Sequence, residues 1–410
     1  MAPHPEYPPS PKNTADRPQT VIVIAASMLT ALVVIVFARL AYGLLLPSMR
    51  ADLGLSYQQA GNLGTINALG YFLFILPGGA AAARWGARNA VIGGLLLVAS
   101  GFIGLTVAHA YWVIAALMLA LGIGTAYCFA PMLSLVATWF PERRGLMIGY
   151  MTAGIGAGLF LAGLLVPWLI ALFGTVGWRV NWGLFAAAAG ATAVLVLAGV
   201  RDPPVHPDTH LESSPAADRG RIYRNPRMIV IGMAYGVIGM SYIVQAIFAV
   251  SFAEASGIAG TTAGRLFAMS GLLAVVTGPL WGRLSDSWGR GNTLLLTVSL
   301  VTLAMAVPIV SQSLPAFFIH FLLFGCTVNG AFTMVQAAST DQVAERHIPI
   351  AVSYATLFFA GGQFLGPAVA GWLIENGGFK WAFGFTCITL LIGVALSQKI
   401  RAFPRKLAVS

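Results

Sequence analysis

The chain has 410 residues, of which 58% are hydrophobic and only 9% are charged, with a formal net charge of +10. Its mean hydropathy is +0.82. Soluble domains carry about 25% charged residues, so this composition excludes a soluble globular protein of this size. Lipid must therefore surround most of the chain.

The N-terminal residues 1–20 are polar and rich in proline, which predicts a disordered tail. They are not typical of a signal peptide, because the apolar run that follows is too long. Twelve apolar stretches then follow one another. About 20 apolar residues cross a bilayer as a helix, because backbone amides in lipid need internal partners. We therefore expect an all-α membrane protein that crosses the bilayer at 21–48, 57–82, 89–108, 111–138, 146–172, 179–200, 228–252, 262–284, 291–311, 314–338, 349–374 and 379–400.

Most Lys and Arg residues fall in the loops on one side of these spans, together with both chain ends. Cytoplasmic loops carry an excess of Lys and Arg, so both termini are predicted to be cytoplasmic in a bacterial inner membrane. The positive net charge follows from this bias and does not indicate a nucleic-acid partner. We also expect a monomer.

Within the first span, Arg39 lies about nine residues from the predicted outer end, roughly 13 Å deep. A charge at that depth must face water, a partner or a ligand. None of the Asp and Glu residues lies deep in a predicted span to pair with it. Arg39 therefore binds an anion, which its planar fork suits, or it has a structural role. In the structural role it snorkels toward the outer interface or bonds backbone carbonyls at a helix break.

The three cysteines Cys128, Cys326 and Cys387 all lie inside predicted spans without the spacing of metal ligands. They predict small apolar packing residues rather than disulfides. No metal site and no cofactor are expected.

The two halves of the chain repeat each other at a nearly constant offset. Gly79, Trp85 and Gly86 recur 203 residues later as Gly282, Trp288 and Gly289. Residues 201–227 separate the halves and are rich in proline and mixed charge. We expect two pseudo-symmetric six-helix bundles, 21–200 and 228–400, with a cytoplasmic linker (201–227) and a cytoplasmic tail (401–410).

This layout resembles the major facilitator superfamily. The superfamily's loop motif Gly-x-x-x-Asp-[Arg/Lys]-x-Gly-[Arg/Lys] is present at 282–290, and a degraded copy with Ala83 in place of Asp lies at 79–87. Residues 139–145 resemble the corresponding loop of monocarboxylate and oxalate transporters, and residues 38–47 resemble the uncharacterised YbfB/YjiJ-like branch. The resemblance implies a gating role for the loop residues Gly79, Arg84, Gly86, Gly282, Asp286, Gly289 and Arg290.

In the superfamily, the first, fourth, seventh and tenth helices line a central cavity, which places Arg39 on a cavity helix. Other polar side chains fall on suitable helices, and Tyr42 follows Arg39 by three residues, on a similar face. The candidate substrate-binding residues are Arg39, Tyr42, Tyr127, Tyr242, Gln245, Asn329, Gln336 and Gln363. Singly, each polar residue also fits a hydrogen bond between packed helices.

We therefore expect a transporter that moves a small organic anion, with a carboxylate as the favoured group, by alternating access. An exporter of amphipathic compounds and a non-transporting sensor are the alternatives, and scattered histidines without buried carboxylates disfavour an enzyme. No ATP-binding loop is present. The protein would work as a uniporter or exchanger, take up the proton on the substrate's carboxylate, or use His320 as a proton site.

Overall fold

The computed structural model describes residues 17–140, 143–202, 222–343 and 347–403. Most of the expected N-terminal tail, linker and C-terminal tail lies outside these residues, so the predictions for those segments stay predictions. The described residues form helices and short connections without strands. The expected all-α membrane fold is therefore confirmed.

The first half of the chain begins with one long span built from three helical pieces. These are α1 (Arg17–Ala31), the π-helix η1 (Leu32–Leu40) and α2 (Tyr42–Leu53). The following helices are α3 (Tyr57–Trp85), α4 (Ala87–Val107), α5 (Tyr111–Trp139), α6 (Arg144–Phe173), the short 3-10 helix η3 (Gly174–Val176) and α7 (Gly177–Gly199).

The second half contains α9 (Pro226–Ala255), α10 (Gly260–Trp288), α11 (Arg290–Val310), α12 (Leu314–Thr340), α13 (Ile348–Gly377) and α14 (Phe379–Arg401). Among the described residues, ten helical stretches are long and apolar enough to span a membrane, or eleven when the bent α10 is included. One of the ten, Leu146–Gly199, comprises both α6 and α7. Each of the twelve predicted spans thus has its own helical stretch, which makes the protein a multi-pass membrane protein.

The first span is longer than the sequence predicted. The helix continues past the expected end at residue 48 and past Pro47, and it ends at Gly54, whose φ of 63° is left-handed. A proline disturbs only the turn that precedes it, whereas a left-handed residue ends the hydrogen-bond ladder.

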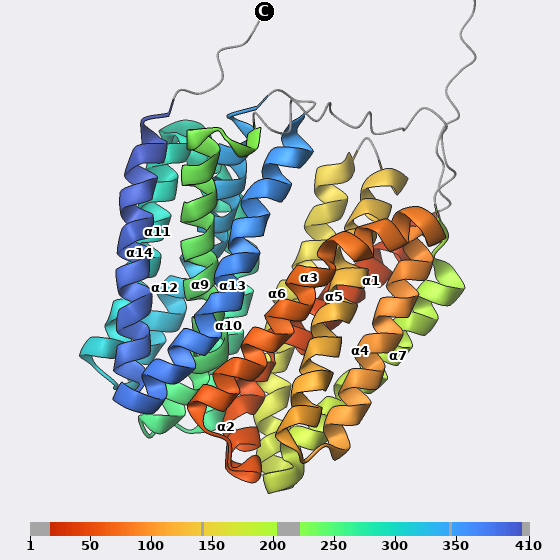
Figure 1. The fold of residues 1–410 in the computed structure, drawn as a ribbon, viewed down its shortest axis with the longest axis vertical. Coiled ribbons are helices and arrows are strands. Elements are labelled where there is room, and N and C mark those ends of the chain that lie inside the picture. Colours follow the sequence, from red (N-terminus) through yellow and green to blue (C-terminus); the bar gives the residue numbers. More distant parts are fainter. Residues whose placement is uncertain (1–16, 141–142, 203–221, 344–346, 404–410) are drawn as a thin grey trace, which may run out of the picture.

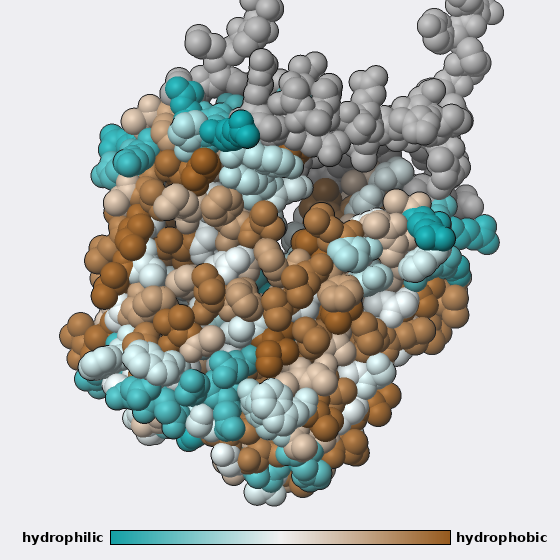
Figure 2. Space-filling model, in the orientation of Figure 1, coloured by the Kyte–Doolittle hydropathy of each residue, from teal (hydrophilic) through white to brown (hydrophobic). Residues whose placement is uncertain are grey.

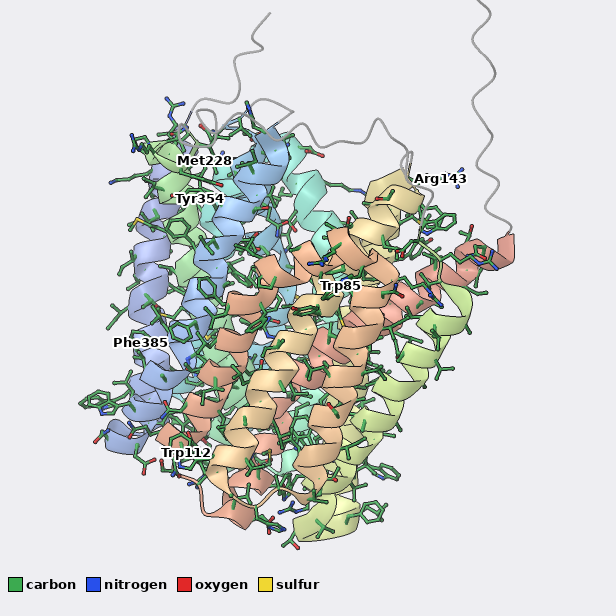
Figure 3. All side chains as sticks on the ribbon, turned by 45° about the vertical axis from the view of Figure 1, so that its right-hand side comes forward. Trp85, Trp112, Arg143, Met228, Tyr354 and Phe385 are labelled. Atoms are coloured by element: carbon green, nitrogen blue, oxygen red, sulfur yellow. The ribbon has the colours of Figure 1, made fainter. Side chains whose placement is uncertain are left out.

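The outer surface is apolar around the middle of the molecule and polar at its two ends, as Figure 2 shows. Large apolar side chains are exposed on the surface of the protein; Leu76, for instance, is 81% exposed. Trp112 is 78% exposed and lies at the opposite end from Met228 and Tyr354 (Figure 3). Aromatic side chains at the ends of an apolar belt are typical of a membrane–water interface.

Helices α1–α7 and α9–α14 form two groups that lie side by side (Figure 1). They meet where α3 packs on α13, α6 on α10 and α2 on α9. Small residues bring the backbones together: a methyl group added at Gly61 would overlap the Pro367 carbonyl oxygen, and one added at Gly43 would overlap that of Ala246. Close approach at small residues is the usual means of packing helices in lipid.

Candidate functional site

The π-helix η1 places a charged side chain in the middle of the molecule. The amide of Ala41 donates to the Val36 carbonyl oxygen at 2.7 Å, five residues back. Neighbouring helices hydrogen-bond two further carbonyls of this segment: Asn67 Nδ2 donates to Ala38 (3.0 Å) and Thr125 Oγ1 to Val34 (3.0 Å). Isolated π-helical turns are often found at functional sites.

Arg39 is buried, with 8% of its surface exposed. Its Nη2 donates to Gln363 Oε1 of α13 at 2.8 Å, and its guanidinium carbon lies 4.5 Å from the centroid of the Tyr71 ring. Its Nε has no hydrogen-bond partner among the described residues. Guanidinium carries five N–H donors, so most of its donor capacity is open to a ligand.

Arg39 also has no acidic partner in the part of the chain that the structure describes. The ion pairs found there join Arg179 to Asp52 and Arg290 to Asp341. The sequence had indicated the same lack of a deep carboxylate.

A cavity of about 580 Å³ lies between the two helix groups and is lined in part by Arg39. Its walls come from η1, α3, α5, α6, α9, α10, α12 and α13. The structure brings six of the eight candidate residues to this cavity: Arg39, Tyr242, Gln245, Asn329, Gln336 and Gln363.

Tyr42 and Tyr127 are not among the lining residues. The Tyr42 side chain is buried, and its hydroxyl donates to the Ala60 carbonyl oxygen at 2.9 Å. We predicted that Tyr42 lies on the same face as Arg39 from α-helical spacing. Arg39 lies in the π-helix, which has a different number of residues per turn, so a separation of three residues does not place the two side chains on one face. The ring of Tyr127 instead lies 6.5 Å from that of Phe74.

Three lining amides already have partners in the protein. Asn329 Nδ2 donates to the Ala274 carbonyl oxygen (2.6 Å), and Gln336 Nε2 donates to the Tyr235 hydroxyl (2.9 Å). Gln245 Oε1 lies 2.8 Å from His320 Nε2. These amides are therefore held in place.

His320 is fully buried behind the cavity wall. Its Nδ1 lies 2.6 Å from the Ala304 carbonyl oxygen, and its Nε2 faces Gln245. It is not itself a lining residue and is connected to the cavity through Gln245.

Four aromatic residues of the cavity wall were not among the candidates: Tyr235, Phe324, Phe332 and Phe359. Together with the candidate Tyr242 they form one cluster, called here the aromatic wall. Ring centroids lie 4.5 Å apart for Tyr235 and Phe359, 5.1 Å for Tyr242 and Phe332, and 5.3 Å for Phe332 and Phe359. The spacing of Phe324, Phe332 and Gln336 along α12, eight residues and then four, was a signal for one helical face.

The two loop motifs form matching turns at the end of the molecule where Arg143 and Met228 lie (Figure 3). Gly86 ends α3 with a φ of 87°, and Gly289 ends α10 with a φ of 96°. Both values favour glycine, which explains why this residue recurs in both halves.

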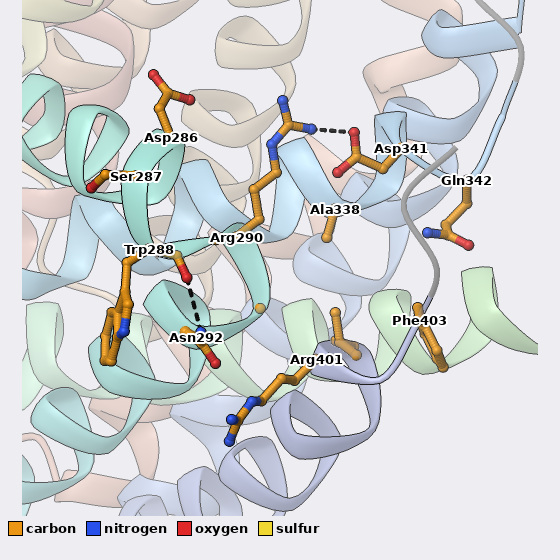
Figure 4. Close-up of a pocket in the computed structure, with 13 residues that line it drawn as sticks. Asp286, Ser287, Trp288, Arg290, Asn292, Ala338, Asp341, Gln342, Arg401 and Phe403 are labelled. Atoms are coloured by element: carbon orange, nitrogen blue, oxygen red, sulfur yellow. Dashed lines mark hydrogen bonds and ion pairs between the residues drawn. The ribbon is translucent and has the colours of Figure 1, made fainter. Parts of the chain in front are cut away.

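The charged residues of the two loops have different partners. In the second half, Arg290 pairs with Asp341 of the segment after α12, whereas Asp286 is exposed (Figure 4). In the first half, where Ala83 replaces the motif's Asp, Asp202 Oδ1 accepts from the Arg88 backbone amide at 2.8 Å. Sequence reasoning had not singled out Asp202 or Asp341. The gating role of Gly79, Arg84, Gly86, Gly282, Asp286, Gly289 and Arg290 stays a prediction.

Comparison with known proteins agrees with this architecture. The family described as "Uncharacterised MFS-type transporter YbfB" matches residues 31–398. The MFS transporter asaE of Aspergillus flavus is 25% identical over 76% of this chain and 70% of its own length. A putative tartrate transporter of Agrobacterium vitis is 24% identical over 85% of this chain and 83% of its own.

Among solved structures, a bacterial homologue of the human lysosomal transporter Spinster, in an inward-facing and unoccupied conformation, is similar in fold. Its TM-score is 0.80 at 18% identity, over 94% of this chain and 98% of that one.

Proposed function

The chain belongs to the family of the uncharacterised MFS-type transporter YbfB, and we propose that it moves a small organic anion, bound through a carboxylate, across the cytoplasmic membrane by alternating access. It is a transporter and not an enzyme. The observation that carries the proposed substrate class is Arg39, a buried cation on the cavity wall with a single amide acceptor.

A guanidinium in the middle of a membrane protein is costly unless it has a partner. Gln363 supplies a neutral acceptor, and the Tyr71 ring supplies a cation–π contact. A carboxylate would offer two charged oxygens in the geometry that the guanidinium fork matches. The relative described as a putative tartrate transporter supports this substrate class.

The described lining of the cavity reaches toward one end of the molecule. Its lining includes Gly149 and Thr152 near the start of α6, and Gln336 near the end of α12. At the opposite end, the Tyr57 amide donates to Glu375 at 2.7 Å, and Thr65 Oγ1 donates to the Phe364 carbonyl at 3.1 Å, so that α3 and α13 are joined. Since positively charged loops favour the cytoplasm, we propose that the open end is cytoplasmic.

For the coupling mode, His320 remains our candidate proton site. When Nδ1 donates to the Ala304 carbonyl, a neutral ring accepts from the Gln245 amide, whereas an imidazolium would donate to the Gln245 oxygen. Protonation would thus turn the Gln245 amide in the cavity wall. Uniport, exchange, and proton entry on the substrate's own carboxylate are the alternative modes.

An exporter of amphipathic compounds is the second candidate function, favoured by the aromatic wall. The two candidates differ in their dependence on the cation: an organic-anion carrier requires Arg39, and an exporter selecting by apolar surface does not.

The test is carboxylate binding to purified Arg39→Lys and Arg39→Ala proteins. Lys keeps the charge but loses the fork, so affinity should fall. Ala should weaken binding by roughly 1.5–3 kcal/mol, which is about ten- to a hundredfold in affinity. Arg265→Ala, which removes an exposed cation of α10, is the matched control. If Arg39→Ala binds carboxylates as the wild type does and merely melts at a lower temperature, Arg39 is a structural residue and the organic-anion function is wrong.

A further inference from the structure

We propose that the occupant of the cavity is a monocarboxylate that carries an aromatic group, with its carboxylate at Arg39 and its ring against the aromatic wall. This inference deepens the proposed function and rests on it. The observation behind it is the distance between the anion site and the aromatic wall.

The anion site at Arg39 and the aromatic wall are connected by one turn of α13. Gln363, which hydrogen-bonds Arg39, follows Phe359 of the aromatic wall by four residues. Side chains four apart on a helix lie on the same face, with Cβ atoms about 5–6 Å apart. A carboxylate on Arg39 thus sits about one helical turn from the Phe359 ring of the aromatic wall, which is the reach of a short arylalkyl chain.

The charge on the cavity wall favours one carboxylate over two. Arg39 is the charged residue in the described lining. The amides of Asn329, Gln336 and Gln245 are engaged by Ala274, Tyr235 and His320. A second carboxylate would lose its water without gaining a cation, and that desolvation is unfavourable.

The size and shape of the cavity also favour a large apolar group. At about 580 Å³ it falls in the range of sites that enclose drug-sized ligands, roughly 300–1,000 Å³. The wall offers both ring faces and ring edges: Tyr235 and Phe359 stack at an interplanar angle of 28°, whereas Phe332 meets Phe359 at 81°. Offset stacked and edge-to-face arrangements are the preferred contacts of an aromatic ring.

The experiment measures binding of 3-phenylpropionate, acetate, tartrate and the neutral 3-phenylpropionamide to the purified full chain by calorimetry. We expect 3-phenylpropionate to bind at least about tenfold tighter than acetate or tartrate, since a buried ring adds more than 1.4 kcal/mol. The neutral amide should bind at least about tenfold weaker than the acid, because it loses the charged hydrogen bonds.

Variants assign the selectivity to its residues. Phe359→Leu keeps most of the side-chain volume, and it should lower 3-phenylpropionate affinity about three- to tenfold while acetate affinity stays unchanged. Trp112→Ala removes an exposed aromatic ring at the end of the molecule and should change neither affinity. Should Phe359→Leu unfold, Phe332→Leu is the second variant.

The outcomes separate the inference from the function it rests on. Tartrate binding tighter than 3-phenylpropionate, with loss in Arg39→Ala, overturns the aromatic monocarboxylate and leaves the organic-anion transporter standing. Equal affinity for the neutral amide and the acid overturns both and favours the exporter of amphipathic compounds. Absence of binding by every carboxylate also overturns both.

Discussion

At the scale of single residues, the contact between Arg39 and Gln363 is the centre of the proposed anion site. The hydrogen bond of 2.8 Å joins η1 to α13 and so connects the two helix groups. Gln363 presents a neutral oxygen where an anionic ligand would present a charged one. A carboxylate placed at position 363 should therefore act as a built-in competitor of the substrate.

Gln363→Glu tests this directly. The new carboxylate should pair with Arg39, raise the melting temperature at neutral pH and weaken carboxylate binding more than about tenfold, because the guanidinium is already neutralised. Calorimetry and thermal unfolding measure the two effects, and Gln58→Glu on the exposed start of α3 is the control. Carboxylate affinity equal to wild type in Gln363→Glu would contradict the anion site.

His320 is the second residue with a testable role. The rings of Phe317, Phe321, Phe324 and Phe383 surround it, and its polar contacts are Ala304 and Gln245. No charged group of the described chain contacts it.

If His320 takes up the coupled proton, His320→Gln should keep carboxylate binding but remove the part of its pH dependence that the imidazole causes. Binding measured from acidic to neutral pH in wild type and variant checks this expectation. An unchanged pH profile would indicate that the proton is carried on the substrate's carboxylate or that transport is not coupled to protons.

At the scale of the element, the π-helix η1 shows where sequence reasoning stops. Apolar length and the loop motifs predicted the helices, and the lack of deep carboxylates singled out Arg39. The π-helix was not predictable, because its stability comes from distant side chains such as Asn67 and Thr125. Because the π-helix was not predicted, Tyr42 was wrongly placed on the cavity face, whereas its hydroxyl donates to the Ala60 carbonyl oxygen.

Asn67 is the clearest test of what holds this element. Its Nδ2 donates to the carbonyls of Ala38 (3.0 Å) and Met118 (3.1 Å), so it connects η1 to α5 beside Arg39. Asn67→Ala should destabilise the protein by about 1–3 kcal/mol, because buried carbonyls lose their donor. It should also weaken carboxylate binding, since Arg39 is less well positioned. Asn376→Ala, which removes an exposed amide bonded within its own helix, should do neither.

At the scale of the whole molecule, the two helix groups are joined tightly at one end and enclose the cavity toward the other. Two kinds of contact hold the joined end: the Tyr57 amide donates to the Glu375 carboxylate, and glycines of α3 and α13 let the helix backbones touch. Alternating access requires this end to open while the other closes. In the proposed alternating-access cycle the backbones separate here in one state and touch in the other, so a bulky residue at the contact should favour separation.

Gly61→Val is the substitution of choice at this contact. A Cβ at position 61 would overlap the carbonyl oxygen of Pro367, and backbone cannot rotate away as a side chain can. The variant should therefore populate the state in which α3 and α13 are apart, and a cysteine placed at Thr65 should react faster with a water-soluble maleimide. Gly93→Val is the matched control, because a Cβ there meets no atom within 4 Å.

A ligand should reverse the effect of Gly61→Val on labelling. A ligand shifts a conformational equilibrium by its difference in affinity between the two states. A carboxylate that binds the present state more tightly should therefore slow the labelling again. Equal labelling of Gly61→Val and Gly93→Val would show that the α3–α13 contact does not separate during transport.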